Sequence, residues 1–173
     1  MRKKISEIIR VNQAGEDGAI RIYKGQLAAL NNKSDQRKQI EHMYAQEIEH
    51  LDYFNKKMLK HRVRPTVMSP IWRIGAYALG YFSGKLGVKA AMACTEAVEE
   101  VIEKHYQQQI NYLEQCNDEE MIALKDKIQD FQNDEVQHKN IGATYSDDSM
   151  RHVVLKAVIR KLTAVAVIIS KKI

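Results

Sequence analysis

The feature that most constrains this chain is the presence of charged side chains inside apolar helical stripes. Buried-type residues recur at alternating spacings of three and four, the period of one helix face, within residues 5–30, 40–58, 92–113 and 124–141. The centre of each stripe is instead acidic or imidazole, at Glu16, at Glu47 and His50, at Glu99, and at Glu135 and His138. Ordinary amphipathic helices keep charge on the opposite face. Because buried carboxylates need a neutralising partner, we predict four helices around a cation site.

The spacing of these residues indicates two metal ions. A Glu-x-x-His pair lies in the second and in the fourth stretch, and three residues on a helix put both side chains on one face. One such pair is weak support, since a solvated Glu beside a surface His arises often by chance. Here, however, Glu47 follows the lone Glu16 by 31 residues, and Glu135 follows the lone Glu99 by 36. This is the ligand set of ferritin-like di-iron and di-manganese bundles, and its oxygen and nitrogen donors suit iron or manganese better than structural zinc.

Neighbouring residues extend the predicted site. Asp134 precedes Glu135, and we expect it either to accept a hydrogen bond from a ligand imidazole or to lie exposed in mid-helix. Tyr106 lies seven residues after Glu99 on the same face, so it either borders the site or belongs to the plain core. His105, beside it, is as consistent with a surface position as with a function. Three more acids lie near Glu99 but off its stripe: Glu96, Glu100 and Glu103.

The four stretches predict an all-α fold in a single domain over residues 1–173. Polar turns at 31–35 and at 117–118 join the helices into two antiparallel hairpins. The long segment between the hairpins, residues 55–89, suits the crossover of a ferritin-like four-helix bundle. Residues 150–173 form an added C-terminal amphipathic helix. The N-terminus runs at once into the first periodic stretch, so we expect neither a signal peptide nor a transit peptide.

Basic charge is segregated into the crossover and the C-terminal segment. Between Tyr53 and Thr95 there are eight Lys/Arg and no acid, and from Arg151 to Ile173 there are six Lys/Arg and again no acid. The crossover also carries four aromatic residues, Trp72, Tyr77, Tyr81 and Phe82. We expect it to lie in a membrane interface, or else to cover the core of the bundle. The same two roles are open for the C-terminal helix, whereas the apolar content argues against nucleic acid. The longest uncharged runs, 74–84 and 162–170, are too short to span a bilayer.

Four segments resemble a known family, the demethoxyubiquinone hydroxylases, which are di-iron monooxygenases of ubiquinone biosynthesis. They are residues 11–26 (VNQAGEDGAIRIYKGQ), 90–100 (AAMACTEAVEE), 105–110 (HYQQQI) and 131–142, which begins FQNDEVQH and ends with Ile141 and Gly142. The resemblance covers nearly the whole chain and shows no departure at a ligand position.

The resemblance implies an enzyme that hydroxylates the ring of a polyprenyl demethoxyubiquinol with O2. It places two iron ions (Fe2+/Fe3+) on the six stripe residues, and it places His105 and Tyr106 at positions associated with the quinone and with electron delivery. Electrons are expected to come ultimately from NADH, although the chain has no Gly-x-Gly-x-x-Gly loop of its own. The resemblance also implies a bacterial-type peripheral protein on the cytoplasmic face of the cell membrane, with other ubiquinone-biosynthesis proteins as partners.

Three alternatives stay open at this point. A ferritin-like ferroxidase uses the same ligands, but it predicts a hollow shell and gives no reason for an aromatic, acid-free crossover. Another membrane-bound di-iron quinol oxidase fits both the ligands and the crossover. A non-catalytic adaptor that keeps a relic of the fold predicts the loss of at least one ligand, and all six are present.

Overall fold

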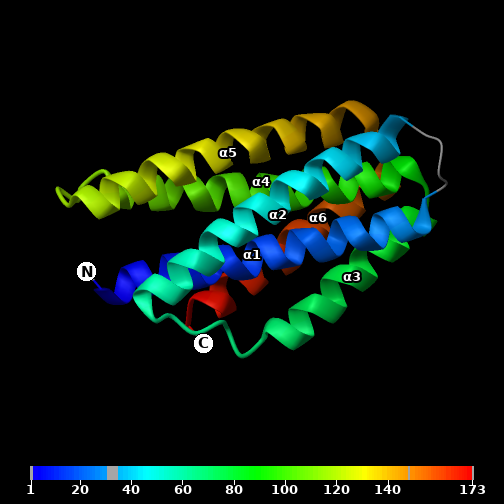
Figure 1. Ribbon diagram of the computed structural model, residues 1–173. Coiled ribbons are helices and arrows are strands. Elements are labelled where there is room, and N and C mark those ends of the chain that lie inside the picture. The colour runs from blue at the N-terminus through cyan, green and yellow to red at the C-terminus, as the bar shows by residue number, and fades with distance from the viewer. Residues whose placement is uncertain (1, 31–34, 148, 173) are drawn as a thin grey trace.

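The computed structural model describes residues 2–30, 35–147 and 149–172, and every regular element in these ranges is an α-helix. In chain order the helices are α1 (Arg2–Ala29), α2 (Asp35–His61), α3 (Ser69–Lys85), α4 (Val88–Leu113), α5 (Glu119–Tyr145) and α6 (Met150–Lys172). Helices α1, α2, α4 and α5 contain the four predicted stripes and run side by side in a bundle (Figure 1). The predicted all-α, ferritin-like class is confirmed.

Local capping explains how the α4–α5 hairpin turns. Helix α4 ends at Leu113, and the Asp118 side chain accepts hydrogen bonds from the backbone N–H groups of Glu120 and Met121, which caps the start of α5. The turn predicted at residues 117–118 is therefore present. In the turn predicted at residues 31–35, only Asp35, the first residue of α2, lies within the described residues.

The crossover between the two hairpins is shorter than residues 55–89 and contains a helix of its own. Helix α2 continues to His61, and α4 already begins at Val88. Between them, α3 starts with Pro70 in its first turn, where a missing N–H does no harm. Gly87, at a φ of 107°, makes the turn from α3 into α4. Helix α3 lies along the outside of α1, as Figure 1 shows, and so returns the chain to the end of the bundle where α4 starts.

Helix α6 covers the bundle beside α3. It packs against α4 and α1, and it is tied to α4 by ion pairs of Lys156 with Glu96 and of Arg160 with Glu100. Its far end is joined to α3 by a hydrogen bond of 3.0 Å from Trp72 Nε1 to Ser170 Oγ. No helix among the described residues is long and apolar enough to cross a bilayer.

Two apolar clusters fill the bundle, one toward each end. One cluster contains Ile8 of α1, Phe54 of α2 and Phe131 of α5, and the other contains Ile40 and Met43 of α2 with residues of α1 and α4. The acidic and imidazole centres of the four stripes lie between these clusters. The site is therefore held at mid-helix and sealed from water on both sides.

Candidate metal centre

The six predicted ligands converge in the middle of the bundle, with at least one from each of its four helices. Every one of them is at most 3% exposed, although each carries a group that is charged or titratable. They are Glu16 from α1, Glu47 and His50 from α2, Glu99 from α4, and Glu135 and His138 from α5. The neighbouring acids Glu96, Glu100 and Glu103 instead pair with basic side chains away from this cluster.

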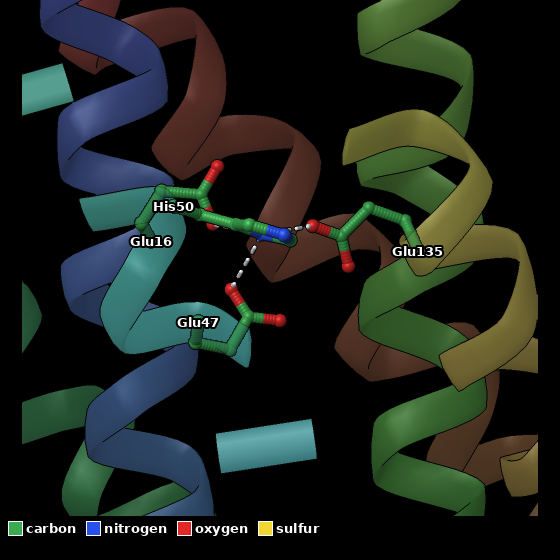
Figure 2. Close-up of side chains that lie close together, drawn as sticks. All are labelled: Glu16, Glu47, His50 and Glu135. Atoms are coloured by element: carbon green, nitrogen blue, oxygen red, sulfur yellow. Dashed lines mark ion pairs between the residues drawn. The ribbon is translucent and has the colours of Figure 1, made fainter. Parts of the chain in front are cut away.

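The six side chains form two overlapping groups. In each group one possible ligand atom per residue lies within 4.8 Å of the others; one group is Glu16, Glu47, His50 and Glu135, and the second is Glu47, Glu99, Glu135 and His138. Figure 2 shows the first group, in which His50 Nδ1 lies 3.5–3.7 Å from a carboxylate oxygen of each acid. His138 Nδ1 lies 3.2 Å from oxygens of Glu47 and Glu135. Glu47 and Glu135 belong to both groups, so each would be available to two ions.

The polar atoms at the centre fit a metal site. Within the described chain, Nδ1 of His50 and of His138, both carboxylate oxygens of Glu47 and Oε2 of Glu135 are buried without a hydrogen-bond partner. Buried polar atoms in folded proteins are nearly always paired. Here the unpaired atoms are carboxylate oxygens and imidazole nitrogens that face one another. Such atoms are the ligands that iron or manganese ions prefer.

Electrostatics points the same way. Burial raises the pKa of Glu16 well above its ordinary value, and the charge of Glu47 raises it further. The pKa of Glu99 is raised in the same way by burial and then by Glu135. Burial acts to lower the pKa of His138, but Glu135 and Glu47 more than offset it and raise the value to about 11. The cluster therefore favours positive charge at its centre, which two divalent cations supply.

Two tyrosines hold the outer carboxylates. Tyr106 of α4 donates a hydrogen bond to Glu16 Oε1 across the bundle, and Tyr23 of α1 donates to Glu99 Oε1 at 2.8 Å. Both hydroxyls are buried, and burial raises the pKa of each phenol well above its ordinary value, so both stay protonated donors. Tyr23 was missed as a site residue in the sequence. The signal was available, because Tyr23 follows Glu16 by seven residues as Tyr106 follows Glu99.

The outer nitrogens of the two imidazoles also have partners. His50 Nε2 lies 3.1 Å from Asp134 Oδ2, the contact that the sequence suggested for Asp134. His138 Nε2 lies 3.0 Å from Gln46 Oε1, a residue that the sequence did not single out. With their Nε2 atoms engaged in this way, both rings direct Nδ1 to the centre.

His105 lies apart from the cluster, unlike its neighbour Tyr106. Its Nε2 accepts a hydrogen bond of 2.6 Å from the Gln109 amide, which in turn pairs with the Asn12 amide. It borders a small pocket that is also lined by Lys4 and Lys171. Burial lowers the pKa of His105 to about 3, and these two ammonium groups lower it as well. The structure thus brings Tyr106, but not His105, into contact with a predicted ligand.

A helical bundle with four carboxylates and two imidazoles in two overlapping groups has the form of the ferritin-like two-metal proteins. Within that class the chain belongs to the family described as ubiquinone biosynthesis protein COQ7, whose model matches residues 3–170. The predicted family is confirmed.

Three relatives illustrate the similarity. The chain is 41% identical over 170 residues to a 3-demethoxyubiquinol 3-hydroxylase of Rhodospirillum rubrum, covering 98% of this chain and 78% of the relative. It is 42% identical over 172 residues to a bovine mitochondrial protein named NADPH-dependent 3-demethoxyubiquinone 3-hydroxylase, which covers 99% of this chain and 79% of the bovine protein. It is 42% identical over 146 residues to the yeast mitochondrial 5-demethoxyubiquinone hydroxylase, which covers 78% of this chain and 63% of the yeast protein.

Proposed function

We propose that this protein is a di-iron monooxygenase that hydroxylates the ring of a polyprenyl demethoxyubiquinol with O2, a step of ubiquinone biosynthesis. The observation that carries the proposal is the buried set of four carboxylates and two imidazoles, in a chain whose relatives are named demethoxyubiquinol and demethoxyubiquinone hydroxylases. The alternatives weighed from the sequence lack this support, because none of the relatives described above is named a ferroxidase, an oxidase or an adaptor.

In this proposal the protein's own residues hold and orient the reaction centre. Iron supplies the capacity to bind O2 and to pass electrons to it. Glu47 and Glu135 would contribute to both metal positions, while Glu16 and Glu99 would each contribute to one and are kept in place by tyrosine hydroxyls. The apolar clusters on either side exclude water, which strengthens every electrostatic interaction within the centre.

An apolar cavity along α1 offers a place for the substrate. It has a volume of about 330 Å3 and lies between α1, α3, α4 and α6. On α1 it is lined by Ala14, Gly15 and Gly18, which flank the ligand Glu16. Leu79 of α3 and Leu162 of α6 line other parts of the wall. A lining of small and aliphatic side chains suits a prenyl chain, and the position next to Glu16 would bring the attached ring toward the metal centre.

The exterior of α3 supports the proposal of a peripheral membrane protein. That it lies on the cytoplasmic face of a bacterial membrane is proposed from the family resemblance and from the bacterial relative. Exposed apolar side chains follow one face at helical spacing, Ile71, Ile74 and Phe82, with Leu86 just beyond the helix. Arg73 and Lys85 are on the same helix, and the whole segment has no acid. Such a face can lie among lipid headgroups while the opposite face packs on α1, so that the two readings of the crossover made from the sequence are compatible.

The electrons are proposed to come ultimately from a reduced nicotinamide. The expectation of NADH is not settled, since the name of the bovine relative specifies NADPH. Other ubiquinone-biosynthesis proteins are proposed as partners, on the strength of the family alone.

The proposal is tested by reconstituting the protein anaerobically with Fe2+ and then adding demethoxyubiquinol and O2. We expect a quinol product whose mass has increased by one oxygen atom, with the oxygen coming from labelled O2. Protein that carries two irons and oxidises Fe2+ without inserting oxygen into the ring would instead support a ferroxidase. Glu99→Ala should lower the bound iron, whereas unchanged iron would exclude Glu99 as a ligand.

A further inference from the structure

We propose that Gln46 and Asp134 make the two metal positions unequal, so that the first divalent ion binds at the position of His50 and the second at that of His138. This inference rests on the two-metal site of the proposed function. It concerns Gln46, a positioning residue that acts through His138.

The centre repeats itself across the bundle. A glutamate on α1 and one on α4 are each followed by a tyrosine seven residues later, and each tyrosine donates its hydrogen bond to the glutamate of the other helix. A Glu-x-x-His pair stands on α2 and another on α5, and each imidazole directs Nδ1 inward. In these respects the two halves are chemically alike, so they would give the two ions similar surroundings.

The repetition breaks at the residue that precedes each Glu-x-x-His pair. On α5 this residue is Asp134, which faces His50 of α2, and on α2 it is Gln46, which faces His138 of α5. One imidazole therefore has a carboxylate behind it and the other a neutral amide.

A hydrogen bond between these two residues fixes the direction of the whole chain of contacts. Gln46 Nε2 donates to Asp134 Oδ1 at 3.2 Å, so the amide oxygen of Gln46 is the atom that faces His138. An amide oxygen accepts only, and therefore His138 Nε2 is the donor. Asp134 Oδ2 accepts in the same way from His50 Nε2. Gln46 thus links the two imidazoles while leaving the single negative charge on the side of His50.

A carboxylate that accepts from a ligand imidazole makes its inner nitrogen a stronger donor than an amide does. The Asp134 side chain is 34% exposed, so water weakens its effect, and we expect a difference near the lower end of the range for such contacts, about tenfold in affinity. Mn2+ supplied at one equivalent should consequently occupy mainly the group that contains Glu16 and His50.

The test is an exchange of the two residues at constant charge, Gln46→Glu together with Asp134→Asn. The new amide can donate to the new carboxylate, so the exchanged pair reproduces the native hydrogen bonds in the opposite direction, with the negative charge now behind His138. Crystals of each protein grown with one equivalent of Mn2+ locate the ion by anomalous diffraction. We expect the ion to move from the His50 group to the His138 group.

A matched control exchanges the same chemical groups where no ligand is touched, Gln129→Glu with Asp130→Asn on α5. Gln129 hydrogen-bonds to Gln132, and the Asp130 side chain is 67% exposed. Here the first ion should stay in the His50 group. Gln46→Ala, followed by calorimetric titration with Mn2+, gives a second measurement, in which we expect the weaker of two binding steps to become about tenfold weaker still.

Equal occupancy in the native protein, or a first ion that stays in place after the exchange, would overturn this inference while leaving a two-metal site intact. Failure of the native protein to bind two ions per chain would overturn it together with the di-iron site of the proposed function. The two failures are distinguished by the total metal content at saturation.

Discussion

At the scale of single residues, the shared position of Glu47 predicts how metal binding fails. Glu47 contributes to both groups of possible ligands, whereas Glu99 contributes to one. Glu47→Gln should therefore abolish binding of both ions, and Glu99→Gln should leave one ion per chain. Metal content measured by mass spectrometry after saturation with Mn2+ decides this, with the surface variant Glu49→Gln as the control. Equal losses from the two ligand variants would contradict a bridging position for Glu47.

His105 predicts a contribution to acid sensitivity. Burial, together with the charges of Lys171 and Lys4, holds its pKa at about 3, against an ordinary value of about 6.5 in the unfolded chain. Between these values the unfolded state binds the extra proton, so this residue makes the folded state less stable as the pH falls below about 6.5, by at most about 1.4 kcal/mol per pH unit. Glu7 also lines the pocket, where its carboxylate lies 3.6 Å from the Lys4 ammonium group.

The check is to replace His105 by Gln in the metal-free protein and to measure urea unfolding from pH 7.5 to pH 4.5. Any stability difference between the two proteins at pH 7.5 should shift in favour of the variant as the pH falls. A difference that stays constant over this range would show that His105 takes up its proton while the protein is folded.

The sequence predicted the six converging residues because all of them lie on helices, where a fixed period relates sequence spacing to direction. It could not predict which carboxylates lie between the two groups, since that depends on how four helices are placed around one centre. Gln46 precedes Glu47 as Asp134 precedes Glu135, so its position carried the same signal, but a carboxylate is the more usual partner of a metal-bound imidazole than an amide side chain. His105 was grouped with Tyr106 by resemblance, but adjacent residues on a helix point in different directions, and the structure separates them.

At the scale of helices, the close crossing of α1 and α3 is set by glycine. A Cβ placed on Gly80 would lie 2.0 Å from the backbone oxygen of Ile22, and one on Gly25 would lie 2.3 Å from that of Tyr77. Since backbone atoms cannot move aside as the end of a flexible side chain can, Gly80→Ala should lower the free energy of unfolding by about 1–3 kcal/mol or more.

Gly75 is the matched control for this prediction, because it lies on the same helix and a Cβ there meets nothing within 4 Å. Gly75→Ala should raise the free energy of unfolding by up to about 1 kcal/mol, through the better helix propensity of alanine. Thermal and urea unfolding of the two variants gives the comparison. If Gly80→Ala were as stable as Gly75→Ala, the close crossing of α1 and α3 would be wrong.

The same glycines show what the sequence left undecided at this scale. The crossover was recognised as basic, aromatic and rich in glycine, yet these properties did not say that Gly80 and Gly84 pack against α1. Its limits were also too wide, because α2 continues to His61 and α4 begins at Val88. The apolar residues of α3 occupy both of its faces, so the period of three and four could not define one buried side.

At the scale of the whole molecule, the proposed membrane contact falls on the side formed by α3 and α6. Helix α3 lies on the outside of α1, away from α5 in Figure 1, and α6, which packs on α4 and α1, is joined to α3 by the Trp72–Ser170 hydrogen bond. Both α3 and α6 expose several large apolar side chains, among them Ile74 and Phe82 on α3 and Leu162 on α6. The proposed substrate cavity lies between these two helices and the bundle. A protein that docks through α3 and α6 would therefore hold the cavity next to the lipid from which a prenyl quinol comes.

This orientation predicts the effect of charge on α3. Ile74 is 74% exposed and Phe82 is 65% exposed, and full burial of such a side chain contributes about 1.5–3 kcal/mol. The double variant Ile74→Glu and Phe82→Glu should therefore bind anionic lipid vesicles at least tenfold more weakly than the native protein, as measured by co-sedimentation. Native binding should also weaken with added salt, because lysine and arginine meet the headgroups.

The control Ile122→Glu, at a 43% exposed position on α5, should bind like the native protein, and both variants should keep their full metal content. Unchanged binding of the double variant would exclude α3 as the membrane contact, whereas an equal loss in the α5 control would show that the effect comes from charge alone.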